Sequence, residues 1–116
     1  MHRRIVLIAM GFSLLGSGFA AAEPVTSLAD PARGKTLAES ICSNCHLVSA
    51  EQKQVTIDIP SFKEIANKTG QTEGAIMAHI VIPKHPMPTI PLTKSELADL
   101  AAYIMSLRDP AGRLNP

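Results

Sequence analysis

The chain has 116 residues, a net charge of +1, and fractions of apolar and charged residues that are ordinary for one globular domain. A near-neutral chain without a cluster of basic residues lacks the positive face that nucleic-acid binding needs, which argues against nucleic-acid partners. The aromatic fraction of 3% is low, so the side chains alone supply little bulk for an apolar core.

The amino-terminal segment has the pattern of a secretory signal peptide. Arg3 and Arg4 form a basic start, an apolar run extends from Ile5 to about Phe19, and alanines at 20–22 offer a cleavage site. The run is shorter than the roughly 20 apolar residues of a membrane-spanning helix, and glycines interrupt it, so an uncleaved anchor is disfavoured. We therefore predict a cleaved Sec-type signal peptide, residues 1–22, and export to the periplasm without a stable membrane anchor.

The mature chain, residues 23–116, is predicted to form a single domain with flexible ends at 23–29 and 109–116. Without the two leader arginines its net charge is about −1. Its only aromatic side chains are Phe62 and Tyr103, since both other phenylalanines lie in the leader. A chain this small struggles to form a sufficient core by itself, and a large bound apolar group would fill the deficit.

A helix is predicted to begin after the polar lead-in. Asp30 offers an N-cap, and Pro31 suits the first helical position, where its missing N–H is harmless. The helix should extend to about Ser43 and should carry the first cysteine of the chain near its carboxyl end.

Both cysteines lie in the segment SICSNCHLV, residues 40–48, where Cys42, Cys45 and His46 form a C-x-x-C-H motif. In such a motif the two thiols can add to the two vinyl groups of a haem. The next residue, His46, then lies under the iron as its proximal ligand. The motif therefore favours one covalently attached haem c.

Two other interpretations of this segment remain open. The cysteines of an exported chain can form a disulfide, but a redox-active C-x-x-C is expected beside a strand-helix-strand pattern, which we do not find. A structural zinc ion could be bound by both cysteines with His79 and His85, although their spacing is at the edge of the usual range. Only the haem interpretation gives His46 a role.

The middle of the chain is predicted to be irregular and then helical. Residues 47–59 show no helical pattern, and the Ile-Pro dipeptide at their end disfavours a helix there. Ser61 can cap a short helix that ends near Lys68, and Thr72 can cap a second helix over 73–81. The segment after this helix, PKHPMPTIPL, contains four prolines and should form a stiff extended loop.

A second axial ligand for the iron would come from the methionines and histidines of the mature chain. The candidates are Met77, Met87, Met105, His79 and His85. Met87 lies between two prolines of the stiff loop, where no helix dictates the direction of its side chain. A thioether suits a six-coordinate, electron-transferring iron. Helical methionines more often pack in a core, so Met87 is the predicted distal ligand.

The last helix has the clearest pattern in the sequence. Thr93 and Glu96 form a capping box, and the helix should end near Arg108. Its apolar residues recur at helical spacing on one face, which comprises Leu97, Leu100, Ala101, Ile104 and Leu107. The predicted fold class is all-α, with three to five helices around one haem and no sheet.

Together these residues resemble the small soluble class I c-type cytochromes, the monohaem cytochrome c family. The resemblance rests on GKTLAESICSNCH (34–46), IPSFKEIA (59–66) and MPTIPLTKSELADLAAYIMSL (87–107), and it covers nearly the whole mature chain. It implies that the first and last helices cross beside the haem with Gly34 and Tyr103 in contact.

The resemblance also implies that the carbonyl of Pro60 accepts a hydrogen bond from the ring N–H of His46, which would fix the tautomer of the imidazole. Two positions depart from the family. Ala38 stands where an aromatic residue is frequent, which predicts looser packing at the helix crossing. Leu47 stands where a glycine is frequent, so the course of the following loop is not predicted.

The function predicted from these features is one-electron transfer in the periplasm between redox proteins, with no enzymatic activity. The walls of the haem site should include Ile41, Ile76, Ile80 and Leu92, which would limit access of water to the haem. Two alternatives are a cytochrome subunit bound to a particular dehydrogenase or oxidase complex, and a haem protein with an open iron site that binds a gas or peroxide.

Overall fold

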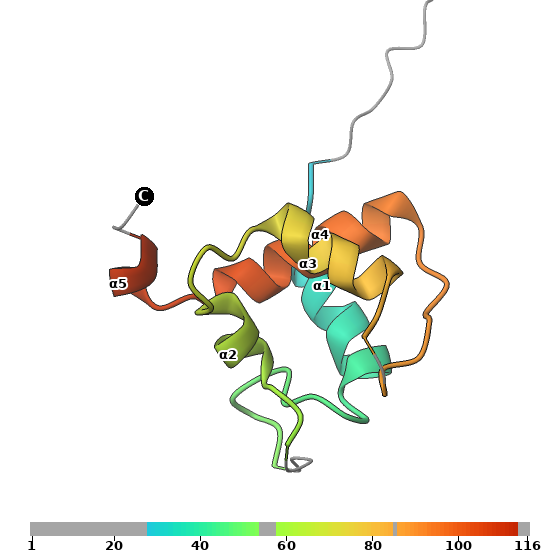
Figure 1. The fold of residues 1–116 in the computed structure, drawn as a ribbon, viewed down its shortest axis with the longest axis horizontal. Coiled ribbons are helices and arrows are strands. Elements are labelled where there is room, and N and C mark those ends of the chain that lie inside the picture. The colour runs from blue at the N-terminus through green and yellow to red at the C-terminus, as the bar shows by residue number, and fades with distance from the viewer. Residues whose placement is uncertain (1–27, 54–57, 85, 114–116) are drawn as a thin grey trace, which may run out of the picture.

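The structure is a computed structural model that describes residues 28–53, 58–84 and 86–113. The predicted signal peptide, its cleavage site and His85 lie outside the described residues. The described part of the chain is helical and contains no strand (Figure 1). Its elements in chain order are α1 (Pro31–Leu37), the π-helical turn η1 (Ala38–Cys42), α2 (Phe62–Ala66), α3 (Glu73–Val81), α4 (Lys94–Ser106) and α5 (Pro110–Arg113). The predicted all-α class is therefore confirmed.

The first predicted helix begins as expected but changes its winding before its end. The Asp30 side chain caps α1, and Pro31 is the first helical residue. The last turn, η1, is wider than an α-helical turn, and the Ser43 N–H donates to the carbonyl of Ala38, five residues earlier, at 3.0 Å. Such turns are rare and are frequently found at functional sites. This one ends at Cys42, whose side chain is buried.

The remaining helices begin where the caps predicted. Ser61 and Thr93 both form complete capping boxes, and α3 covers the nine residues expected for it. The ends are less regular: α2 ends at Ala66, before the predicted Lys68, and α4 ends at Ser106. The short helix α5 lies in a segment for which no helix was predicted. None of the helices in the described ranges has both the length and the hydrophobicity of a membrane span.

The guanidinium of Arg108 attaches the carboxyl end of α4 to the end of α2 and the segment that follows it. Its Nε donates to the carbonyl of Ala66 at 2.8 Å, and Nη2 donates to the carbonyls of Gln71 at 3.1 Å and Lys68 at 3.4 Å. Carbonyls at the end of a helix have no partner within the helix, and this guanidinium supplies one. Sequence analysis gave Arg108 no role.

Helix α4 is the centre of the fold and contacts α1, α2 and α3 (Figure 1). The contact with α1 is closest at Gly34. A Cβ atom there would lie 2.0 Å from the Asp99 carbonyl oxygen and 2.8 Å from the Tyr103 Cβ, so only glycine fits. The predicted meeting of Gly34 and Tyr103 is confirmed. The predicted looser packing of this crossing is wrong, because the backbones meet closely at Gly34 and Ala38 is 0% exposed.

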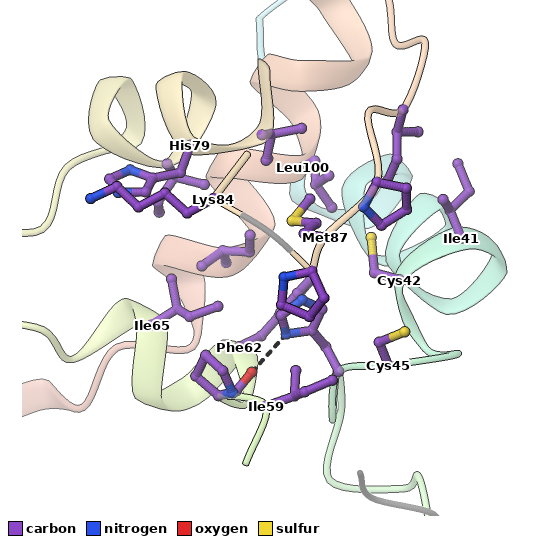
Figure 2. A pocket seen from close by; sticks show the side chains of 18 of the residues that line it. Ile41, Cys42, Cys45, Ile59, Phe62, Ile65, His79, Lys84, Met87 and Leu100 are labelled. Atoms are coloured by element: carbon purple, nitrogen blue, oxygen red, sulfur yellow. Dashed lines mark hydrogen bonds between the residues drawn. The ribbon is translucent and has the colours of Figure 1, made fainter. Parts of the chain in front are cut away.

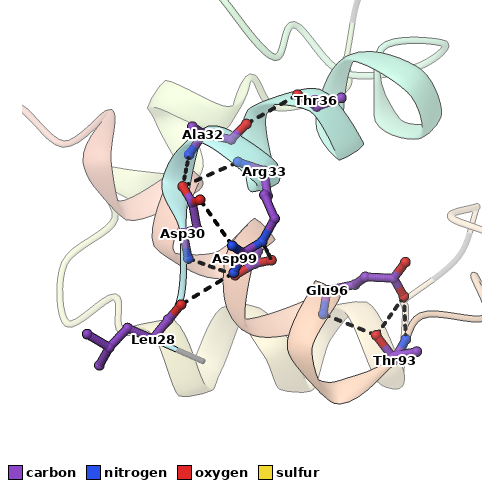
Figure 3. A network of polar contacts seen from close by, with 8 residues as sticks. All are labelled: Leu28, Asp30, Ala32, Arg33, Thr36, Thr93, Glu96 and Asp99. Carbon is purple, nitrogen blue, oxygen red and sulfur yellow. Dashed lines mark hydrogen bonds and ion pairs between the residues drawn. The ribbon is translucent and has the colours of Figure 1, made fainter. Parts of the chain in front are cut away.

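A polar cluster of Asp30, Arg33 and Asp99 also joins the start of α1 to α4 (Figure 3). The Arg33 guanidinium donates to both carboxylate oxygens of Asp99, from Nε at 2.7 Å and from Nη2 at 3.0 Å. The Asp30 backbone N–H donates to the same carboxylate at 2.7 Å. The hydrogen bond from Arg33, followed by that from Asp30, lowers the pKa of Asp99, so its carboxylate stays ionised although the residue is only 3% exposed.

The core lies between α1, α2, α3 and α4, and both aromatic residues of the predicted mature chain are in it. Phe62 and Tyr103 are buried and meet edge to face, with ring centroids 6.4 Å apart. The predicted apolar face of α4 is confirmed, with Leu100, Ala101 and Ile104 buried and its end residues partly buried. This small core borders a large cavity.

Candidate functional site

A cavity of about 630 Å³ opens between the end of η1, the segment before α2, helices α3 and α4, and the proline-rich loop (Figure 2). Most of its lining is apolar. The apolar lining residues are Ile41, Ile59, Pro60, Phe62, Ile65, Ile76, Ile80, Pro86, Met87, Pro88, Ile90, Leu100 and Ile104, and the two cysteines, His46 and several polar residues complete it. Such a size and composition suit a large, mostly apolar ligand.

The thiols of Cys42 and Cys45 both line this cavity and are free. They differ in exposure, since Cys42 is buried and Cys45 is exposed. Burial raises the pKa of the Cys42 thiol to about 11, and the neighbouring Cys45 adds to the effect. Figure 2 shows both cysteines on the same side of the drawn side chains, where they could attach one edge of a bound group.

The ring of His46 is held in one orientation at the cavity. Its Nδ1 lies 2.7 Å from the carbonyl oxygen of Pro60, and its centroid lies 5.5 Å from that of the Phe62 ring. A carbonyl oxygen only accepts hydrogen bonds, so Nδ1 carries the proton and Nε2 is the nitrogen with a free lone pair. An imidazole in this tautomer can bind a metal through Nε2.

A backbone turn at Asp58 leads the chain to this carbonyl. Asp58 has a φ of 75°, in the left-handed region that aspartate adopts more readily than most residues. The next two residues, Ile59 and Pro60, line the cavity. The left-handed residue thus belongs to the segment that presents the Pro60 carbonyl to His46.

Among the predicted distal ligands, the structure separates the methionines. Met87 lines the cavity and lies in the middle of the side chains drawn in Figure 2. Met77 and Met105 pack against the hydrophobic core and are not among the lining residues. His79 also lines the cavity, and its Nδ1 donates to the carbonyl of Ala75 in its own helix at 2.7 Å.

Three of the four predicted wall residues line the cavity, namely Ile41, Ile76 and Ile80. The prediction for Leu92 is wrong, because that side chain packs against the core cluster and does not reach the lining. Sequence analysis missed Phe62, Ile65, Leu100 and Ile104 as wall residues. The helical spacing of Leu100 and Ile104 marked them as buried, but could not say what they face.

The zinc interpretation finds no support in the described residues. Within them, no three His, Cys, Asp or Glu side chains converge as metal ligands would. The donors at the cavity include two thiols, one thioether and the imidazoles of His46 and His79, each with a free Nε2, around apolar walls. Thiols that add to vinyl groups and nitrogen or sulfur ligands for iron are what a haem c requires, so these residues fit that group.

The class of protein follows from comparison with known sequences. The family model for cytochrome c matches residues 31–108, and the chain belongs to the cytochrome c family. Over 80 residues it is 36% identical to cytochrome c-552 of Bradyrhizobium diazoefficiens, a match that covers 69% of this chain and 77% of the relative. No solved structure gives a significant match. The resemblance drawn from the sequence is thereby confirmed: the protein is a class I c-type cytochrome, a haem-based electron carrier with covalently bound haem c.

Proposed function

We propose that the protein is a periplasmic electron carrier whose haem is bound through Cys42 and Cys45 and whose iron is bound by His46 and Met87. One observation carries this proposal: the three motif residues and Met87, from the distant proline-rich loop, line the same apolar cavity. When bound, the haem iron supplies one-electron chemistry by cycling between the ferric and ferrous states.

The residues around the cavity have separable tasks in this function. Pro60 keeps the proton on Nδ1 of His46, which leaves Nε2 for the iron and strengthens the imidazole as a ligand. The isoleucine and leucine walls exclude water, which affects the reduction potential. Because Cys45 is exposed, the edge of the haem attached to it would be accessible to a redox partner. Redox partners of this kind dock through small, transient interfaces.

Substitution of Met87 tests the ligand set. Met87→Ala should abolish the near-infrared methionine-to-iron charge-transfer band of the oxidised protein, lower the reduction potential and admit external ligands. Met77→Leu and Met105→Leu are matched controls, because both side chains pack in the core away from the lining and should leave the band unchanged. A wild-type protein without this band would overturn the proposal and favour an open iron site that binds a gas or peroxide.

Export and the non-enzymatic role can be tested on the protein from its native source. Periplasmic extracts should contain the haem protein, and its amino-terminal sequence should begin at Glu23. The purified carrier should pass electrons between redox proteins without transforming a substrate of its own. Recovery only in the cytoplasm would contradict the proposed location.

A further inference from the structure

The backbone that carries His46 is held by a side chain to which no part of the function so far assigns a task. The carboxamide of Gln52 makes three hydrogen bonds to the attachment segment, residues 43–48. Its Nε2 donates to the carbonyl of Ser43 at 3.1 Å and to that of His46 at 3.0 Å, while its Oε1 accepts from the Val48 N–H at 3.0 Å. The three partners lie before, at and after His46.

This arrangement needs a carboxamide. The group has two N–H donors and an acceptor oxygen, and the site presents two carbonyl acceptors and one N–H donor. The reverse orientation would place the amide oxygen against two carbonyl oxygens, so the network decides how Gln52 is oriented. A carboxylate of the same size could keep the bond from Val48 but would repel both carbonyls.

The same segment is attached to the rest of the fold by two further backbone contacts. The Leu47 carbonyl accepts from the Phe62 N–H at 2.9 Å, and the Val48 carbonyl accepts from the Tyr103 hydroxyl at 2.7 Å. Neither contact is made by His46 itself. Of the described hydrogen bonds outside the motif's own turn, those that hold His46 are the bond of its carbonyl to Gln52 and the bond of its ring to Pro60.

We propose that Gln52 is a positioning residue for the proximal ligand. By holding the backbone on both sides of His46, its carboxamide keeps the imidazole at the distance and angle at which Nδ1 meets the Pro60 carbonyl. The inference rests on the proposed function, in which His46 binds the iron. It assigns a task to the loop that follows Leu47, where the sequence departs from the family it resembles.

The test measures the ring of His46, whereas the three hydrogen bonds of Gln52 described above go to backbone groups. In the reduced holoprotein, Gln52→Met keeps the side-chain length but removes all three bonds, and the His46 Nδ1 proton should then exchange with solvent about tenfold faster by NMR. The reduction potential should rise, because a weaker bond to Pro60 makes the imidazole a poorer donor to ferric iron. A purely local role of Gln52 would move neither quantity.

Asn67→Leu is the matched control for loss of a bridging amide. Asn67 donates to the Lys63 carbonyl at 2.9 Å and accepts from the Asp109 N–H at 3.0 Å, and it does not line the cavity. It should leave the Nδ1 exchange rate and the potential unchanged. Gln52→Glu should also speed the exchange. Ala50→Glu adds the same charge at an exposed neighbouring residue and should leave the exchange rate unchanged, which separates loss of the carboxamide from the effect of charge alone.

The outcomes distinguish this inference from the ligand assignment. Slow Nδ1 exchange and an unchanged potential in both Gln52 variants would overturn the positioning role. The ligand assignment would still hold in that case if the wild-type protein shows the methionine-to-iron charge-transfer band. If neither variant yields a folded holoprotein, the wild-type protein provides the test. Its Val48 amide proton and both Nε2 protons of Gln52 should exchange slowly, and exchange at the rate of free amides would refute the proposal.

Discussion

Two regions of α4 face different surroundings and are stabilised differently. Against α1, the chain supplies every contact itself: Gly34 lets the backbones meet, and the carboxylate of Asp99 receives three hydrogen bonds from Asp30 and Arg33. On the cavity side, Leu100 and Ile104 contribute apolar surface to a space of about 630 Å³ in which we propose that the haem binds. One surface of α4 therefore packs against another part of the chain, and a second surface lines the proposed haem site.

This difference shows how a small chain with few aromatic residues can form a stable fold. The helix crossing sets the position of α4 through sterics and hydrogen bonds, whereas the cavity walls gain their burial from a covalently attached group. The two regions should therefore respond to different substitutions.

Loss of the attachment should have the largest effect. In Cys42→Ala/Cys45→Ala, covalent haem should be lost completely, seen as absent haem staining on a denaturing gel, and far-ultraviolet circular dichroism should show reduced helix. Asn44→Ala changes a residue of the same motif that is neither a thiol nor a proposed iron ligand, and it should stain as the wild type does. A doubly substituted chain with native helix content would show that the crossing alone suffices.

Substitution of Gly34 at the helix crossing should have the next largest effect. In Gly34→Ala, the new Cβ would lie 2.0 Å from a backbone oxygen of α4, so the helices must separate, at a cost of about 3 kcal/mol in unfolding free energy. Denaturant titration of the holoprotein measures it. Gly74→Ala is the control, since nothing lies within 4 Å of that Cβ position and alanine favours the helix. Equal stability of the two variants would contradict the close crossing.

The buried hydroxyl of Tyr103 links the crossing to the attachment segment. Tyr103→Phe removes the donor to the Val48 carbonyl and leaves that buried acceptor unpaired, which should cost about 1 to 3 kcal/mol in unfolding free energy. Thermal unfolding of the holoprotein provides the measurement. Ser106→Ala removes a hydroxyl that bonds only within α4 and should change stability less. A Phe variant as stable as the wild type would show that the bond contributes little.

Acid should have the smallest effect, confined to low pH. The pKa of Asp99 is held below its ordinary value of 3.8 in the folded protein, mainly by Arg33. Its contribution to stability is therefore complete above about pH 4 and is lost as the pH falls from there through the lower, folded pKa. Asp99→Asn should flatten this acid limb in denaturant titrations at stepwise pH. Asp109→Asn, which disrupts an exposed pair with Lys63, should leave the limb as steep as in the wild type.

Much of the fold could be predicted because its signals are local. Caps at Asp30, Ser61, Thr72 and Thr93 each begin a helix in the structure, since a side chain that bonds the first free N–H groups acts within one turn. The ends were less predictable. The π-helical turn η1 and the attachment of Arg108 depend on partners that are distant or arise from packing.

The site was predictable to a similar degree. The C-x-x-C-H spacing and a methionine between prolines can be recognised in the sequence. The structure brings the side chains of these two cysteines, the histidine and the methionine to one cavity. Leu92 was misplaced, and Gln52 and Asp99 were missed. A period of 3.6 residues marks which side chains are buried, but it does not distinguish a core face from a cavity wall.

The sequence by itself determined the class of protein, the helical composition and the kind of cofactor, because these follow from spacings of a few residues along the chain. The folded structure was needed to show how the Asp30, Arg33 and Asp99 cluster holds the crossing, and that Gln52 bonds the backbone on both sides of His46. Those contacts depend on the directions in which side chains leave the folded backbone. Hydrogen bonds require such directions to within a narrow range, and a one-dimensional pattern does not contain them.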